Sequence, residues 1–184
     1  MELEFSVADA NDAEALAQLI NSAYRGETSR LGWTTEADLL DGRRIDAAGI
    51  FELLAESDSL ILACKWQTQL LGSVHLRHAA RQVHIGMLAV SPAHQGQGIG
   101  KQLLQQAEQW ATRIWPVRVF VMAVIPQRRE LIEFYQRRGY RSTGRIEPFP
   151  ENPALWTPKV GGLCLKLLEK PVQQAQMSLN SGDY

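Results

Sequence analysis

The segment from Val90 to Leu104 constrains the fold of this chain most, because it places three glycines directly before a helical pattern. Gly96, Gly98 and Gly100 occupy alternate positions in VSPAHQGQGIGKQLL. Glycine inside a helix costs about 1 kcal/mol relative to alanine, so this run indicates a turn whose backbone stays bare. A bare turn at a helix N-terminus can bind phosphate, since unpaired N–H groups and the positive end of the helix dipole meet there.

The spacing of the glycines does not fit two common nucleotide-binding motifs. A Walker A loop needs a glycine five residues before Gly100, where this chain has Gln95, and a serine or threonine where it has Gln102. The G-x-G-x-x-G dinucleotide motif needs a glycine where this chain has Lys101. The loop therefore predicts phosphate binding of another kind.

The hydrophobic pattern predicts alternating strands and helices without an internal repeat. Alternating or continuous apolar runs predict strands over 2–7, 59–65, 70–77, 83–90, 117–125, 140–144 and 162–168. Helical periodicity and capping residues predict helices after Asp9 and over 34–40, 47–55, 99–114 and 129–138. This alternation is typical of a protein with helices packed on a central sheet.

The composition predicts one cytoplasmic domain over residues 1–170. The chain has 184 residues, 45% of them hydrophobic, which suffices for one core, and its net charge of -1 indicates neither a nucleic acid nor a membrane partner. There is no secretory signal pattern, and no apolar run approaches the roughly 20 residues that span a bilayer. Cys64 and Cys164 are expected to be small core residues. The Gln/Ser/Asn-rich tail over 171–184 is expected to be disordered.

The motif Gln95-x-x-Gly98-x-Gly100 resembles the Q/R-x-x-G-x-G/A signature of the GNAT acetyltransferase superfamily, whose loop wraps the pyrophosphate of acetyl-CoA. IGMLAVSP (85–92) is similar to the family's fourth strand, and ELIEFYQRRGY (130–140) to its helix with a tyrosine. The resemblance covers residues 59–144. It implies an α/β (α+β) fold with a mixed central sheet of about seven strands flanked by about four helices.

The resemblance also implies an acetyl-CoA site that uses no metal ion. The backbone of Leu88, Ala89 and Val90 would pair with the pantetheine arm, and the Leu88 amide would polarise the thioester carbonyl. A strand bulge at Gly86 would splay two strands apart for the cofactor. The loop and helix start that would hold the pyrophosphate comprise Gln95, Gly96, Gln97, Gly98, Ile99, Gly100 and Lys101.

Two further residues follow from the helix motif. Tyr135 matches the family tyrosine and is the candidate general acid, because a phenol with a pKa of about 10 is protonated at pH 7 and can donate to a departing thiolate. Its alternative role is to pack beside Leu131. Many relatives have an asparagine seven residues before this tyrosine, where this chain has Arg128, whose guanidinium is expected to reach cofactor oxygens.

Among the four histidines, His84 is the candidate general base. It occupies the position of a glutamate in histone-acetylating relatives, and imidazole, with a pKa of about 6.5, suits proton relay from an amine. Its alternative role is that of a solvent-facing strand residue. His75 and His78 are expected to be surface residues at strand ends, and His94 lies in the loop before Gln95.

The acceptor is expected to be a primary amine of a small molecule or a peptide, because the family modifies many amines on one scaffold. Segments 24–40 and 147–159 are expected to form the specificity surface. Trp33 and Trp156 would wall a pocket for a small amine or an α-amino group; alternatively they plug the core under two long loops. Charges there are mixed and do not predict the sign of the acceptor.

Other functions remain compatible with the sequence. The chain could be a protein lysine acetyltransferase, an acyl-CoA-binding regulatory module without turnover, or an unrelated phosphate-binding protein. Retention of Tyr135 and of a possible base argues against the regulatory module. Whether the chain forms a homodimer stays open.

Overall fold

A seven-stranded mixed sheet forms the centre of the protein. The structure is a computed structural model that describes residues 2–172. The strand order is β1-β3-β4-β5-β6-β9-β7, and all neighbours are antiparallel except β5 and β6. The strands are β1 (Glu4–Val7), β3 (Ser59–Trp66), β4 (Gln69–Ala79), β5 (Gln82–Val90), β6 (Val119–Val124), β7 (Arg141–Pro148) and β9 (Cys164–Pro171). The mixed sheet predicted from the sequence is confirmed.

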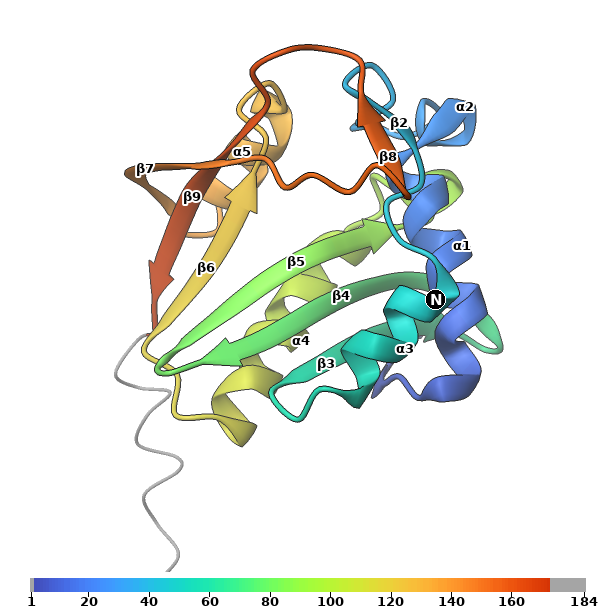
Figure 1. Cartoon of the computed structure of the whole chain (residues 1–184). Helices are drawn as coiled ribbons and strands as arrows, with labels where there is room; N and C mark the ends of the chain where they lie inside the picture. Colours follow the sequence, from blue (N-terminus) through green and yellow to red (C-terminus); the bar gives the residue numbers. More distant parts are fainter. Residues whose placement is uncertain (1, 173–184) are drawn as a thin grey trace, which may run out of the picture.

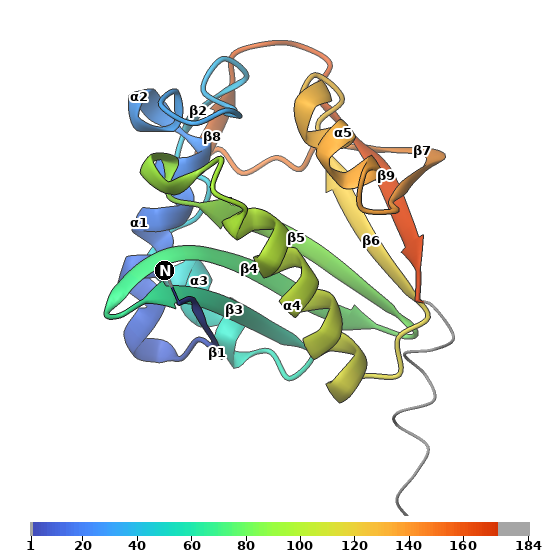
Figure 2. The same ribbon diagram turned by 180° about the vertical axis from the view of Figure 1, so that it is seen from behind.

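Helices cover both faces of this sheet (Figures 1 and 2). α1 (Ala13–Tyr24) and α3 (Ala47–Ala55) pack on one face, while α4 (Ile99–Ile114) and α5 (Arg129–Gln136) pack on the other. The alternation of β3 explains the two cores, because Leu62 faces α4 whereas Ile61 faces α1. The remaining helical segments are α2 (Gly26–Ser29) and the 3₁₀ turns Ala10–Asp12 and Pro92–His94. Across residues 2–172, no helix is long and apolar enough to cross a membrane.

The two halves of the sheet diverge between β5 and β6. The parallel pairing of these strands ends at His84 and Val121, and Figure 1 shows them spreading apart from there. Opposite β4 the register of β5 also shifts: Gly86 pairs with His75 and Ala89 with Ser73. Two residues of β5 therefore face one of β4, which is a β-bulge. The bulge expected at Gly86 lies directly after it, at Met87 and Leu88. The edge of β5 that faces β6 is free beyond His84, where the sheet opens.

A two-stranded sheet that the sequence did not predict closes one side of this opening. β2 (Leu40–Gly42) pairs with β8 (Trp156–Pro158), so that segment 149–163 crosses near the ends of β5 and β6 (Figure 1). The helix predicted over 34–40 is wrong. The Thr34 hydroxyl donates to Glu130 Oε1 at 2.7 Å instead of capping a helix, and Leu40 already belongs to β2.

The C-terminal end of the described chain continues the sheet. Pro171 ends β9, and the Val172 N–H donates to the Arg118 carbonyl at 2.9 Å. The rest of the tail that the sequence predicts to be disordered, 173–184, lies outside the described residues.

The substitution Gly42→Ala is expected to loosen the small sheet. Gly42 has φ +89°, and a Cβ there would lie 2.2 Å from the Leu155 carbonyl oxygen. Backbone strain of about 1–2 kcal/mol and overpacking of about 1–3 kcal/mol should together lower the free energy of unfolding by about 2–5 kcal/mol. Urea denaturation measures this loss.

Gly26→Ala is the matched control. Gly26 has φ +67°, but a Cβ there would meet nothing within 4 Å. In this variant the free energy of unfolding should therefore fall only by the backbone strain, about 1–2 kcal/mol. Equal losses in the two variants would contradict the role given to the contact between Gly42 and Leu155.

Candidate functional site

Two cavities lie on either side of the β5 bulge. The first has a volume of about 320 Å³ and the second of about 300 Å³. Leu88 lines the first cavity, whereas Gly86 and Met87 line the second. Tyr24, Arg128 and Leu131 line both, so the cavities adjoin at these residues. The divergence of the strands thus produces two compartments that meet beside the bulge.

The glycine loop forms the floor of the first cavity at the N-terminus of α4. Gly96 has φ +75° and Gly98 φ +83°, a conformation that residues other than glycine rarely adopt. A Cβ at either residue would meet nothing within 4 Å, so the backbone faces open space. Ile99, Gly100 and Lys101 extend this floor into the first turn of α4, where the N–H groups of a helix end have no intrahelical partner.

The charges around the first cavity are all positive. Its charged lining residues are Lys101, Arg128, Arg137 and Arg138, and no described carboxylate lines it. Arg138 is held in place, because its Nη1 donates to the Phe134 carbonyl at 2.6 Å and its guanidinium lies 3.4 Å from the centre of that ring. A bare helix N-terminus among cations suits a polyanion such as a diphosphate. Within residues 2–172, no group of three or more potential metal ligands comes together.

Gln95 also lines the first cavity, but its side chain is bonded within the protein. Its Nε2 donates to the Val90 carbonyl at 3.0 Å, and its Oε1 accepts from the Trp33 N–H at 3.0 Å. Gln95 therefore ties the end of β5 to segment 32–33. Of the other predicted cofactor residues, Leu88 and Val90 line the cavity, whereas Ala89 is buried behind it and Gln97 is exposed outside it.

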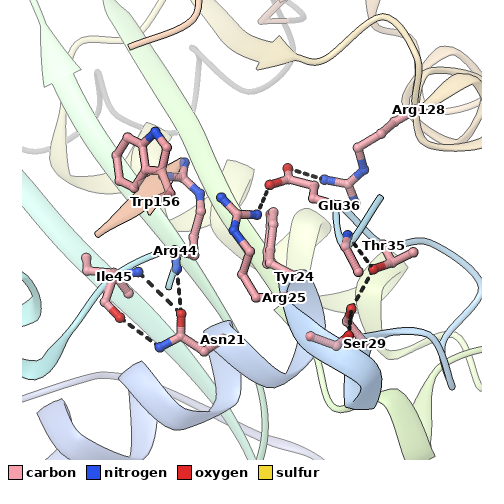
Figure 3. Close-up of polar contacts among 12 residues, drawn as sticks. Asn21, Tyr24, Arg25, Ser29, Thr35, Glu36, Arg44, Ile45, Arg128 and Trp156 are labelled. Atoms are coloured by element: carbon pink, nitrogen blue, oxygen red, sulfur yellow. Dashed lines mark hydrogen bonds and ion pairs between the residues drawn. The ribbon is translucent and has the colours of Figure 1, made fainter. Parts of the chain in front are cut away.

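A buried ionic cluster lies at the junction of the cavities, both of which Arg128 lines, and Figure 3 shows its side chains. Arg128 Nη1 donates to Glu36 Oε1 at 2.7 Å, and Arg25 pairs with the other oxygen of Glu36. The Arg128 Nη2 also donates to Thr34 Oγ1 at 3.0 Å. No side chain of the two ion pairs is more than 7% exposed.

This cluster gives Arg128 a role that differs from the predicted one. Burial disfavours the charged form of Arg128 and lowers its pKa. The attraction of Glu36, together with smaller contributions from neighbouring groups, outweighs burial, so the pKa of Arg128 is raised. Its guanidinium is committed to Glu36 and Thr34, so it holds segment 34–36 against α5 rather than extending freely to a ligand. Glu36 lies in the predicted specificity segment 24–40, but no local pattern marks it individually, because Arg128 lies far away along the chain.

Two tyrosines flank the junction of the cavities. The Tyr24 hydroxyl donates to the Leu88 carbonyl at 3.2 Å. Tyr135 lines the second cavity from α5, where burial raises its pKa, and no described residue hydrogen-bonds to its hydroxyl. Tyr135 was predicted from its motif, whereas Tyr24 was expected only as the first residue of the specificity segment 24–40. The only signal for its burial was its place on the row of α1 that contains Leu16 and Ile20.

Two histidines line the second cavity. His84 is exposed on β5, opposite Arg77 of β4. His75 was expected at the surface but is half-buried and bonds to the Ser59 hydroxyl at 2.9 Å. Burial, followed by the positive charges of Arg77 and Arg44, lowers the His75 pKa to about 4. His75 is therefore neutral at pH 7, and His84 is the histidine that remains open to solvent.

The two tryptophans do not share a pocket. Trp33 lines the first cavity, where its ring centre lies 5.9 Å from that of Phe134. Trp156 is buried beside Leu40, and its Nε1 donates to the Pro150 carbonyl at 3.3 Å. It faces a separate cavity of about 420 Å³ within segment 149–163. For Trp156 the geometry agrees with the alternative role, a plug beneath a long loop.

Glu36→Gln is expected to lower the free energy of unfolding by about 3–5 kcal/mol, because it leaves two buried guanidinium groups without a counter-charge. Chemical denaturation measures the loss. Asp38→Asn is the matched control, since Asp38 pairs at 2.7 Å with the solvent-exposed side of Arg30 and should contribute less than about 1 kcal/mol. A small loss in both variants would show that the cluster is not a stabilising support.

Comparison with known proteins agrees with this geometry. The acetyltransferase (GNAT) family model matches residues 14–140. The fold is similar to that of ribosomal-protein-S18-alanine N-acetyltransferase from Escherichia coli, with a TM-score of 0.69, 12% identity and coverage of 100% of this chain and 99% of the other. No curated protein matches the chain in sequence.

Two other similar structures contain a cofactor. The PaiA N-acetyltransferase from Thermoplasma acidophilum in complex with coenzyme A has a TM-score of 0.65, 17% identity and coverage of 94% and 100%. YncA from Salmonella typhimurium with acetyl-CoA has a TM-score of 0.66, 20% identity and coverage of 94% and 95%. The family match spans more than half of the chain, and the glycine loop and the divergent strands lie within it. The protein belongs to the GNAT acetyltransferase family.

Proposed function

We propose that this protein transfers the acetyl group of acetyl-CoA to a primary amine of a small molecule or to an α-amino group. The observation that carries the proposal is the pair of adjoining cavities at the β5 bulge. One cavity presents bare backbone and cations, and the other presents titratable side chains. Two reactants that enter from opposite sides would meet beside Leu88, without a covalent enzyme intermediate.

The first cavity fits the cofactor. The N–H groups around Gly96, Gly98 and Gly100 would bind the pyrophosphate, and Lys101 would add a positive charge at its rim. Leu88 and Val90 would accompany the pantetheine arm along the free edge of β5. In this arrangement Arg128 would hold segment 34–36 in place through Glu36, and Trp33 would lie against the cofactor in the first cavity.

The second cavity would hold the acceptor and the groups that move protons. Acetyl-CoA supplies the acetyl group as a thioester; the amine nitrogen bonds to its carbonyl carbon as the carbon–sulfur bond breaks. The Leu88 N–H would polarise that carbonyl. His84, directly or through water, would accept the proton that the amine loses. Tyr135 would give a proton to the leaving thiolate.

Tyr135 suits the acid role better than Tyr24 does. Burial raises the pKa of both phenols, so both are protonated at pH 7. The proton of Tyr24, however, is directed to the Leu88 carbonyl. The Tyr135 hydroxyl makes no hydrogen bond to a described residue and lines the acceptor side. We therefore assign the proton donation to Tyr135 and a structural bond to Tyr24.

Gly98→Val is expected to abolish the stabilisation by acetyl-CoA, because its side chain would fill the space in which the pyrophosphate approaches the backbone. In the wild type, a ligand at 100 times its dissociation constant stabilises by about 2.7 kcal/mol, which raises the melting temperature. Thermal denaturation with and without acetyl-CoA, in the absence of added metal, measures the shift.

Gly144→Val is the control for backbone strain. Gly144 has φ +79° with nothing within 4 Å of a Cβ, and it lies on β7 away from both cavities. This variant should be destabilised but keep the shift produced by acetyl-CoA. A full shift in Gly98→Val would refute the proposed pyrophosphate site.

Tyr135→Phe is expected to lower turnover by about 10²–10⁴-fold, with little change in acetyl-CoA affinity, if its hydroxyl delivers the proton. Release of the coenzyme A thiol with a panel of primary amines measures turnover. Tyr24→Phe is the matched control, because it removes the other hydroxyl at the junction and should have a much smaller effect. A larger loss in Tyr24→Phe would transfer the acid role to Tyr24.

The same panel tests the reaction as a whole. Thiol release with small amines or α-amino groups that exceeds release with lysine peptides supports the proposed acceptor class. Better turnover of the lysine peptides would indicate a protein lysine acetyltransferase. Binding of acetyl-CoA without turnover of any amine would indicate a regulatory module.

A further inference from the structure

The second cavity contains an excess of positive charge. Its charged lining residues are Glu36, Arg44, Arg77 and Arg128. Glu36 is the one carboxylate among them, and it is already shared between Arg128 and Arg25. The cavity that would receive an amine, which is a cation in solution, is therefore itself cationic.

Two of these arginines have partners within the protein. Arg128 is neutralised in part by Glu36. Arg77, at the outer end of β4, lies 3.2 Å from Glu56 Oε2 and 3.9 Å from Asp58 Oδ2. The charges of Arg128 and Arg77 are thus already paired with carboxylates of the protein.

Arg44 differs, because its guanidinium forms no ion pair or hydrogen bond with any described residue. It lies beside two aromatic rings, 5.9 Å from the centre of Tyr24 and 6.0 Å from that of Trp156. Aromatic faces attract a cation but provide no hydrogen-bond acceptor for its N–H groups. The Arg44 guanidinium thus lies beside two aromatic rings, and its N–H groups have no hydrogen-bond acceptor among the described residues.

The backbone that carries Arg44 is held firmly. The Asn21 Oδ1 accepts from the Arg44 N–H at 2.6 Å, and the Asn21 Nδ2 donates to the Ile45 carbonyl at 2.7 Å. Figure 3 shows this clamp below the arginine, whose side chain reaches toward Trp156. Asn21 and Tyr24 both belong to α1. One helix therefore holds the backbone of Arg44 and also carries one of its aromatic neighbours.

We propose that the acceptor amine carries a carboxylate, and that Arg44 binds this carboxylate in the second cavity. This inference rests on the proposed acetyl transfer and names the chemical class of its acceptor. A planar guanidinium presents two parallel N–H groups that match the two oxygens of one carboxylate. The carboxylate takes no part in the transfer; it orients the amine toward Leu88.

Charge balance favours such an acceptor over a simple alkylamine. An ammonium group alone would add to the positive charge of the cavity, whereas an amine with a carboxylate enters without net charge. His75 lines the same cavity, and its pKa is lowered to about 4 by burial and then by the charges of Arg77 and Arg44. The positive charges of this cavity would likewise favour the neutral form of the amine, which attacks the thioester.

The test compares acceptors that differ only in the carboxylate. The proteinogenic amino acids and their carboxamides are assayed with acetyl-CoA, and kcat/KM is calculated per free amine because their amine pKa values differ. The best wild-type acid should exceed its carboxamide by about 10- to 100-fold, the usual range for a hydrogen bond to a charged group. Arg44→Gln should remove this preference, and Arg44→Lys should keep part of it.

Arg43→Gln is the matched control. Arg43 is the exposed neighbour of Arg44 and lines neither cavity. This variant should retain the wild-type preference for acids. An equal preference for acids and carboxamides in the wild type, or a preference that survives Arg44→Gln, would overturn the inference while leaving acetyl transfer intact.

Product binding separates this inference from the proposed function. N-acetyl amino acids and N-acetyl carboxamides are titrated into the protein saturated with coenzyme A, by calorimetry. Tighter binding of the acids in the wild type but not in Arg44→Gln supports the carboxylate site even if no amine is turned over. Absence of turnover with every amine would refute the acetyl transfer alone; absence of a difference in binding would refute the Arg44 site alone.

Discussion

The separation of β5 from β6 is the constraint on which the rest of the structure depends. Parallel pairing stops at His84, and the bulge between Gly86 and Ala89 also interrupts the pairing with β4. A sheet with continuous pairing would satisfy its own backbone groups and leave no edge for a ligand. Because pairing with β6 stops just before the bulge opposite β4, β5 keeps a free edge beside the bulge, with one cavity on each side.

A buried ionic cluster connects elements on the two sides of this opening. Glu36 joins Arg25 at the end of α1 to Arg128 at the start of α5. Removing these charged groups from water costs free energy, and their mutual attraction offsets that cost only while all three are present. The cluster therefore connects the end of α1 to the start of α5. Its two arginines and one carboxylate carry a net positive charge beside the second cavity, which Arg128 and Glu36 line.

The two cavities differ in the groups that they present, and this difference follows from local structure. In the first cavity, the loop around Gly98 presents backbone groups, which bind phosphate without regard to the rest of a ligand. The second cavity presents individual side chains such as Arg44 and His84. In the proposed reaction, the backbone loop would bind the cofactor and the side chains of the second cavity would select the acceptor.

The sequence by itself determined the elements whose signals are local. The alternation of apolar residues indicated the strands. The spacing Gln95-x-x-Gly98-x-Gly100, with the strand before it and the helix motif around Tyr135, indicated the phosphate loop and the family. All of these signals depend on near neighbours along the chain. Only the tertiary structure decided where side chains with distant partners lie. Thr34 bonds to Glu130 instead of starting a helix, and Arg128 turns to Glu36, since each partner lies more than ninety positions away. The positive charge of the second cavity was likewise hidden, because it is the sum over residues that meet only in three dimensions.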